Sequence, residues 1–161
     1  MPKRLNGEQR KRFLEGRHVA VLATIGSQGE PVLTPIWYVY EGGRILMRTS
    51  KDSVKAKNVG RDPRVTVCVQ DEAAPYKSVT IYGQAVLEGE HQELGARIAR
   101  RYLGLVGGMA YQRFAADEVQ QGEEVTIAIT PDKVLTQDFS AETPLAGKVW
   151  LRLKKVLPAG L

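Results

Sequence analysis

Short β-type runs follow one another from residue 19 to residue 88, and this succession leaves few folds open to the chain. Runs rich in β-branched and aromatic residues occupy residues 19–25, 31–40 and 44–49, and two more occupy residues 64–70 and 79–88. Glycine-bearing turns separate the first three runs, so we expect an antiparallel meander there. The strand-helix-strand alternation of a parallel nucleotide-binding sheet does not appear. The sequence therefore predicts a mainly β protein, a β-barrel with helices around it.

Two features shape the later strands. Gly83 interrupts the run 79–88, which predicts a bulge or a bend of the kind that barrels use. A last β pair is expected from residues 125–130 and 133–136, with Pro131-Asp132 as the turn between them. A barrel of about six strands fills its interior with its own side chains, so a sizeable ligand belongs outside it or at a subunit contact.

Helix-type segments surround the β runs. The opening 8–14 is polar and helix-compatible, and 91–103 has the apolar spacing of an amphipathic helix. A glycine-rich loop and a further short helix at 109–119 are expected to follow it. Between the third and fourth strands, Ser50 or Asp52 can cap a short helix that ends at a glycine.

Length and composition restrict the class further. At 161 residues the chain is one domain by default, spanning 1–161, and its mixed charges are typical of a globular protein. No stretch approaches the roughly 20 apolar residues of a membrane span, and the residues after Met1 lack the apolar core of a signal peptide. We therefore expect a cytoplasmic protein without membrane contact. The single cysteine, Cys68, lies in an apolar run and is expected to be a buried, inert thiol.

Positive charge is unevenly distributed along the chain. The formal net charge is +5, with basic clusters at both termini and within residues 44–64. Such clusters suit anionic partners, or they form a basic surface that is only solvated. Nucleic-acid binding is disfavoured, because no recognised reading module accompanies the charge.

The segment 48–58 brings hydroxyl groups and cations from a strand end into a helix start. Unpaired N–H groups at a helix N-terminus, its positive dipole end, and nearby Lys and Arg donors favour an anion such as a phosphate. With a helix start near Asp52, the side chains of Lys51 and Lys55 share one side of the helix. A lysine-rich surface helix with no ligand is the alternative interpretation.

A second feature is the proline within the segment Thr34-Pro35-Ile36-Trp37. A proline inside a strand removes a ladder donor, which implies an edge or a local break with backbone groups free to face a ligand. A planar heterocycle fits such a place. Trp37 and Tyr38 are equally explained as core or interface aromatics.

Taken in order, these pieces resemble a known family. The residues that carry the resemblance are Ala23-Thr24-Ile25-Gly26-Ser27-Gln28-Gly29-Glu30-Pro31, Thr34-Pro35-Ile36-Trp37, Gly42-Gly43, Thr49-Ser50, Ser53-Val54-Lys55-Ala56-Lys57-Asn58-Val59 and Arg61-Asp62-Pro63-Arg64-Val65. Their order looks like that of the pyridoxamine 5'-phosphate oxidase-like split β-barrel family, and more narrowly it is similar to the flavin/deazaflavin oxidoreductases of the B group. The resemblance covers a core at 17–139 and leaves 140–161 as a C-terminal extension.

The resemblance implies a six-stranded antiparallel Greek-key barrel of the FMN-binding split-barrel type. It also implies a homodimer with two equivalent cofactor sites at the subunit interface, each holding coenzyme F420 or FMN. The cofactor-binding residues that it implies are Thr34, Pro35, Ile36 and Trp37 at the ring system, Arg48, Thr49, Ser50, Ser53, Lys55 and Lys57 at the phosphate, and Tyr76 and Lys77 from the partner subunit.

The expected function follows from this resemblance and from the side chains. The sequence offers no convincing acid-base pair, metal-ligand cluster or nucleophile triad, which suits a redox enzyme whose cofactor supplies the chemistry. We expect an F420-dependent reductase that transfers a hydride to a planar conjugated small molecule, with FMN as the alternative cofactor. A non-catalytic carrier of flavin or haem is the competing function. The C-terminal Arg- and His-containing substrate motif of the pyridoxamine phosphate oxidases proper has no counterpart, which argues against vitamin B6 chemistry.

Overall fold

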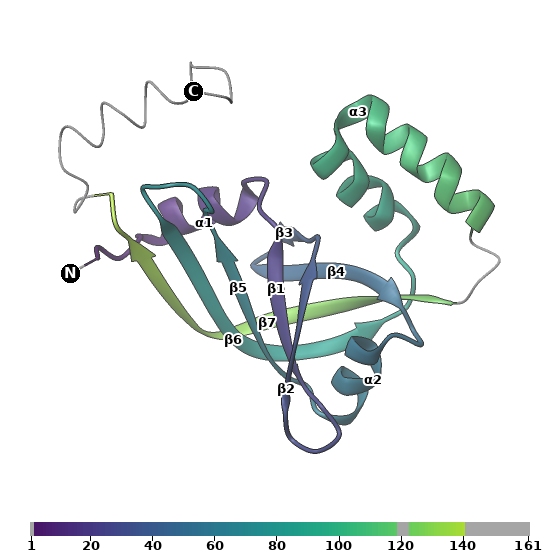
Figure 1. Cartoon of the computed structure of the whole chain (residues 1–161), viewed down its shortest axis with the longest axis horizontal. Coiled ribbons are helices and arrows are strands. Elements are labelled where there is room, and N and C mark those ends of the chain that lie inside the picture. The colour runs from purple at the N-terminus through teal and green to yellow at the C-terminus, as the bar shows by residue number, and fades with distance from the viewer. Residues whose placement is uncertain (1, 119–122, 141–161) are drawn as a thin grey trace, which may run out of the picture.

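A single antiparallel sheet, curled into a half-open barrel, forms the body of the protein, and three helices lie outside it (Figure 1). The computed structural model describes residues 2–118 and 123–140. The strands are β1 (Ala20–Ile25), β2 (Pro31–Ile36), β3 (Val39–Glu41), β4 (Arg44–Ser50), β5 (Arg64–Gln70), β6 (Lys77–Glu88) and β7 (Glu124–Asp138), and the helices are α1 (Gly7–Glu15), α2 (Val54–Arg61) and α3 (Gln92–Glu118). The prediction of a mainly β barrel with helices is confirmed.

The two edges of the sheet are joined by only two residues. The strand order is β2-β1-β5-β6-β7-β4-β3, so β2 and β3 lie at opposite edges, yet only Trp37 and Tyr38 separate them in the chain. Three Cα-to-Cα steps of about 3.8 Å bridge at most about 11 Å. The sheet must therefore curl until its edges meet, and the barrel follows from this short link.

This link corrects the sequence-based expectation for residues 31–40. We expected one strand in the middle of a three-stranded meander, but the segment splits into β2, which pairs with β1, and β3, which pairs with β4. The split adds one strand, and the joining of the last two expected runs into β7 removes one, so the sheet has seven strands. The split occurs because this one β-rich run contains the last residues of one edge strand, β2, and the first residues of the opposite edge strand, β3.

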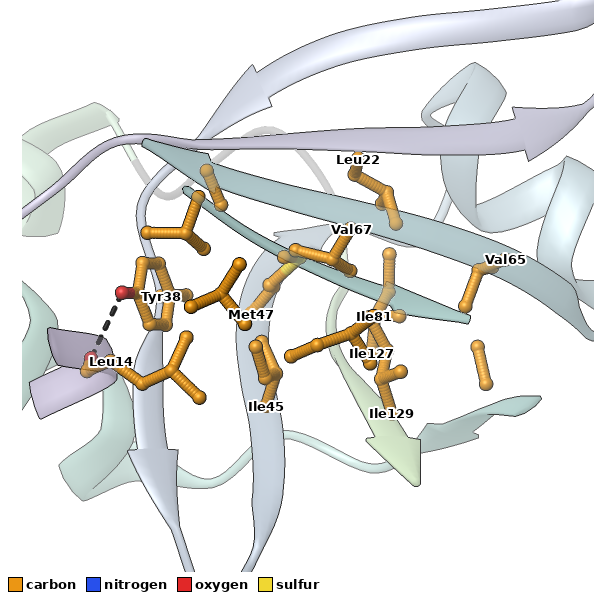
Figure 2. Packing of buried hydrophobic residues seen from close by; sticks show 14 of the residues in the cluster. Leu14, Leu22, Tyr38, Ile45, Met47, Val65, Val67, Ile81, Ile127 and Ile129 are labelled. Atoms are coloured by element: carbon orange, nitrogen blue, oxygen red, sulfur yellow. Dashed lines mark hydrogen bonds between the residues drawn. The ribbon is translucent and has the colours of Figure 1, made fainter. Parts of the chain in front are cut away.

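Apolar side chains on the inner faces of the strands fill the barrel. Figure 2 shows Tyr38 and Met47 packed beside aliphatic residues from other strands, and both are fully buried. The Tyr38 hydroxyl donates a hydrogen bond of 2.9 Å to the carbonyl oxygen of Leu14, which joins the link to α1. Burial of each large apolar side chain stabilises the fold by about 1.5–3 kcal/mol, so the core is the main source of stability.

The helices begin and end close to the expected places, with instructive differences. Helix α1 matches the prediction and starts with a capping box at Asn6. Helix α2 is capped by Ser53, whose side chain accepts from the Ala56 amide, because Ser50 still belongs to β4. The predicted caps Ser50 and Asp52 are therefore wrong, and Lys51 lies outside the helix.

Helix α3 is broken at Gly104, where φ is 73° and ψ is −176°. The break separates the two helices expected from the sequence, although the predicted loop is helical after Gly104. The end of the second predicted helix, Val119, lies outside the described residues, as does the C-terminal extension from residue 141 onward. Within the described residues, the structure contains no helix of the length and apolarity needed to cross a membrane.

Cys68 does not occupy the buried position expected for it. In β5 the buried residues are Val65, Val67 and Val69, so Cys68 points to the outer face and is only half-buried. The sequence does carry this signal, because Val65, Val67 and Val69 alternate with Thr66 and Cys68, and a period of two places the cysteine on the face opposite the valines.

The predicted β pair at the end of the barrel is one continuous strand. In the ladder with β6, Tyr82 pairs with Lys133 and Gly83 pairs with Pro131, so Asp132 is the extra residue of a bulge. The bulge or bend that we expected at Gly83 is thus confirmed. Pro131 and Asp132, which we expected to form a turn, lie within β7 at this bulge.

We expect the substitution Gly83→Ala to destabilise the barrel. A Cβ atom at Gly83 would lie 2.3 Å from the carbonyl oxygen of Thr130, a backbone atom that cannot move aside. Overpacking of this kind costs about 2 kcal/mol of unfolding free energy, measurable by urea denaturation. Gly89→Ala is the matched control, because a Cβ there has no atom within 4 Å. Equal stability of the two variants would contradict the bulge.

Candidate functional site

A pocket of about 440 Å³ opens beside the link between the two sheet edges. Its walls come from β2, the link, β4, α2, α3 and the start of β7. The lining residues are Val19, Pro35, Ile36, Trp37, Arg48, Thr49, Lys55, Gly95, Ile98, Tyr111 and Glu124. Apolar and charged side chains meet here, and the volume is in the range of small-molecule sites.

One half of the pocket is aromatic. The ring of Trp37 stacks on Tyr102 with centroids 4.8 Å apart and an interplanar angle of 4°, and Tyr111 lies tilted at 6.1 Å. Helix α3 supplies both tyrosines. Behind them, Leu94 and Ile98 pack with Val39 in a small core between α3 and the sheet. The sequence left open whether Trp37 and Tyr38 belong to the core or to a ligand site. In the structure, Tyr38 fills the barrel and Trp37 lines the pocket.

The other half of the pocket lies at the start of α2. The hydroxyl of Thr49 donates to Ser53 Oγ over 3.1 Å, and Ser53 caps the helix. Lys55, in the first turn, lines the pocket. No carboxylate of the described residues pairs with Lys55, whereas Lys51 pairs with Glu123 and Lys57 with Asp52. A helix N-terminus with an available ammonium group is a suitable place for an anion.

Arg48 is held between two carboxylates. Its Nε atom forms an ion pair with Glu124, and its Nη2 atom lies 3.2 Å from Glu90 Oε1. Helix α3 passes directly against the guanidinium group, since a Cβ at Gly95 would lie 2.6 Å from Arg48 Nη1. The arginine therefore enters the pocket with its charge already compensated, and a bound anion would have to share it with Glu124.

The structure brings together many of the residues implied by the resemblance. Pro35, Ile36, Trp37, Arg48, Thr49 and Lys55 line the pocket, and Ser50, Ser53 and Lys57 belong to the same β4–α2 connection or to α2. Thr34 pairs with Leu22 in β1 and is not among the residues that line the pocket. Its backbone contact with a ligand stays a prediction.

Tyr76 and Lys77 lie elsewhere in the chain. They line a separate pocket near the start of β6 together with Asp71 and Phe139. The resemblance implies them as contacts from a partner subunit, and that role stays a prediction.

Several lining residues were missed by the sequence-based analysis. They are Val19, Gly95, Ile98, Tyr111 and Glu124. Gly95 and Ile98 lie on the inner face of an amphipathic helix that the sequence did predict, but nothing in the sequence indicated that this face borders a ligand site. The pairing of Ser50 with Glu124 brings β7 beside β4, and this long-range register has no local signal.

Neither histidine lines the pocket. His18 Nδ1 lies 3.3 Å from Asp71 Oδ1, and His91 Nε2 lies 3.1 Å from Glu88 Oε2. Each histidine thus lies against a nearby carboxylate and away from the pocket lining. Burial raises the pKa of Tyr102, so its phenol stays protonated and able to donate at neutral pH. The arrangement suits binding and orientation of a ligand more than acid-base chemistry by side chains.

The curled sheet with a pocket beside its closing link defines the chain as a split β-barrel protein. A family model for pyridoxamine 5'-phosphate oxidase matches residues 7–138. The chain therefore belongs to the pyridoxamine 5'-phosphate oxidase-like family, as the sequence motifs indicated. No curated protein matches the chain.

Solved structures agree with this assignment. A conserved hypothetical protein from Mycobacterium tuberculosis superposes with a TM-score of 0.71 at 26% identity, over 87% of this chain and 89% of that one. An F420 reductase superposes with a TM-score of 0.60 at 18% identity, covering 78% and 94% of the two chains. The haem storage protein HutZ from Vibrio cholerae gives 0.62 at 20% identity, covering 87% and 99%. The last two likenesses show the fold alone.

We expect Glu124→Gln to strengthen anion binding in the pocket. The substitution removes the carboxylate that shares Arg48 with a ligand, so inorganic phosphate should bind about fivefold more tightly at low ionic strength. Isothermal titration calorimetry with phosphate measures the effect. Glu123→Gln is the control, because Glu123 pairs with Lys51 and does not line the pocket. Unchanged affinity in both variants would remove Arg48 from the anion site.

Proposed function

We propose that the chain is a flavin- or deazaflavin-dependent oxidoreductase, and specifically an F420-dependent reductase that transfers a hydride to a planar conjugated small molecule. The observation that carries the proposal is the division of the pocket into an aromatic half, with Trp37 and Tyr111, and a cationic half at Lys55. A flavin-type cofactor has the matching division, with a planar ring system at one end and a phosphate at the other.

The residues of the pocket suit the two ends of such a cofactor. Trp37 and Pro35 offer apolar surface to a ring system, and the backbone at Pro35 lacks the N–H group that would otherwise join the ladder. Lys55 and the first turn of α2, capped by Ser53, offer charge and N–H groups to a phosphate. When bound, the cofactor would supply the hydride chemistry, and the protein would supply binding, orientation and electrostatics.

Coenzyme F420 is our choice over FMN for two reasons. The sequence motifs are similar to those of the B group of flavin/deazaflavin oxidoreductases, and further cations lie beside Lys55. Lys51 and Lys57 are exposed and held only by surface ion pairs, which contribute about 0–1 kcal/mol each. Both lysines can therefore turn to a longer anionic tail at little cost. FMN, with one phosphate, needs fewer of these charges and is the alternative.

We also propose that the protein is a homodimer. The outer face of the sheet carries a row formed by Leu33, Ala23, Thr66 and Tyr82 across β2, β1, β5 and β6. Leu33 is 64% exposed and Tyr82 is 42% exposed, and Pro35, which lines the pocket, belongs to the same face. A second copy on this face would cover the apolar row and border the pocket, which would allow the partner subunit's Tyr76 and Lys77 to reach the cofactor.

A carrier of flavin or haem is the second candidate, because one of the similar folds is a haem storage protein. The pocket argues against haem. Haem iron is usually held by a histidine, cysteine, methionine or tyrosine. Among the described residues, no histidine, cysteine or methionine lines the pocket, and Tyr111 is the single tyrosine that does. Turnover of reduced F420 with quinones or enones would separate the enzyme from a carrier, for which binding without turnover is expected.

We expect Lys55→Gln to weaken the binding of F420 and of FMN by about tenfold, because a charge-assisted hydrogen bond to the phosphate is lost. Quenching of fluorescence during titration with each cofactor measures the affinity. Lys11→Gln is the matched control, with the same change of charge at an exposed lysine of α1 that does not line the pocket. Riboflavin, which has no phosphate, should bind the wild type and Lys55→Gln equally. Tight binding of FMN with no response to F420 would overturn the choice of cofactor.

We expect Leu33→Glu to convert the dimer into a monomer, because two carboxylates would be buried at the symmetric contact. Sedimentation equilibrium measures the change. Val106→Glu is the control, since Val106 is exposed on α3, away from the outer face of the sheet. A wild-type protein that sediments as a monomer would contradict the proposed dimer.

A further inference from the structure

Trp37 lies on the link between the sheet edges, and the sheet does not fix its side chain. The link has no ladder partner on either side, because β2 ends at Ile36 and β3 begins at Val39. Tyr38 is anchored in the core, but Trp37 faces the pocket, where ring rotation would change the shape of the aromatic half. Something outside the sheet must therefore set the orientation of this ring.

Tyr102 of α3 is the contact that can do so. Its ring is nearly parallel to Trp37, at 4.8 Å and 4°, and Tyr102 is not itself a lining residue of the pocket. Gly95, Ile98 and Tyr102 follow helical spacing on one face of α3, and the first two line the pocket. Tyr102 thus acts through Trp37 and not by contact with a ligand.

Hydrogen bonds to the backbone of His18 and of Tyr38 hold the hydroxyl group of Tyr102 in place. It donates to the carbonyl oxygen of His18 over 2.5 Å, and it accepts from the backbone N–H of Tyr38 over 3.3 Å. The Arg101 guanidinium carbon lies 5.8 Å from the centre of the Tyr102 ring, and Arg101 also donates to the Leu14 carbonyl at the end of α1. The Tyr102 ring is therefore held through its hydroxyl group by backbone atoms and through its faces by Trp37 and Arg101.

We propose that Tyr102 is the positioning residue for ring binding, which holds Trp37 parallel to itself and thereby sets the planar slot that admits a tricyclic ring. The proposal rests on the proposed function for the identity of the ligand, but its geometric part concerns the ligand-free protein. Tyr102→Leu removes the stacking partner and the hydroxyl group, and Tyr102→Phe removes the hydroxyl group alone.

The test uses the fluorescence of Trp37 in the ligand-free protein. The chain has two tryptophans, Trp37 and Trp150, so Trp150→Phe serves as the background in which Trp37 is the only emitter. We expect Tyr102→Leu to shift the emission to longer wavelength and to raise acrylamide quenching about twofold, because the stacked face becomes accessible. Tyr102→Phe should change both by less. Leu103→Ala, an exposed neighbour on the same helix, is the matched control and should change neither.

The second readout separates the two halves of the pocket. FMN and F420 should bind Tyr102→Leu about tenfold more weakly, the loss expected for an aromatic pair of this geometry, and inorganic phosphate should bind with unchanged affinity. Equal emission and quenching in Tyr102→Leu and the background would overturn the proposal. If Tyr102→Leu does not fold, as judged by circular dichroism, Tyr102→Met, which also lacks a stacking ring, takes its place, and emission and quenching identical to the background would overturn the proposal. If neither cofactor binds the wild type, the proposed function fails, while the fluorescence result still judges the role of Tyr102.

Discussion

The closure of the sheet by the Trp37-Tyr38 link is the constraint on which the rest of the structure depends. Because the two residues connect strands at opposite edges, the sheet cannot lie flat, and its inner face becomes the wall of a barrel. The two side chains of the link then lie in different environments. Tyr38 fills the interior and binds α1 through the Leu14 carbonyl, and Trp37 remains outside as a wall of the pocket. The fold and the candidate site therefore share one short stretch of backbone.

The pocket itself is an arrangement of elements that are remote in sequence. The β4–α2 connection supplies the cationic end, the link supplies the aromatic ring, and α3 closes the side between them. The close approach of Gly95 to Arg48 lets α3 lie near the sheet, and Glu90 and Glu124 compensate the arginine charge. This compensation leaves Lys55 as a lining cation that no described carboxylate pairs with. The split of the pocket into two chemically distinct halves is the observation on which our proposal of a flavin-type ligand rests.

Local patterns in the sequence were sufficient for most of the fold. The alternating runs predicted the strands, Gly83 predicted the bulge, and the polar and amphipathic segments predicted the helices. The errors occurred where tertiary pairing overrides a local signal. Pro131-Asp132 has the composition of a turn, yet the bulge opposite Gly83 accommodates it within one strand. Ser50, Asp52 and Ser53 are all good helix caps, and the structure selects Ser53, whose side chain accepts from the Ala56 amide, while Ser50 still belongs to β4. Several residues implied by the resemblance line one pocket, and their role in binding stays a prediction. Tyr111 and Glu124 reach the same pocket through long-range packing that no local pattern encodes.

The break in α3 at Gly104 allows one wall of the pocket to vary without a change in the barrel. The first part of the helix is bound to the barrel through Leu94 and Ile98, whereas the part after the break carries Tyr111 to the pocket and leaves Leu105 and Val106 exposed. A residue with φ of 73° lets the direction of the helix change without strain. Insertions or deletions just after this glycine would reposition one aromatic wall and leave the barrel packing intact. The same scaffold can thus bind ligands of different width through changes in a segment whose large apolar side chains are exposed.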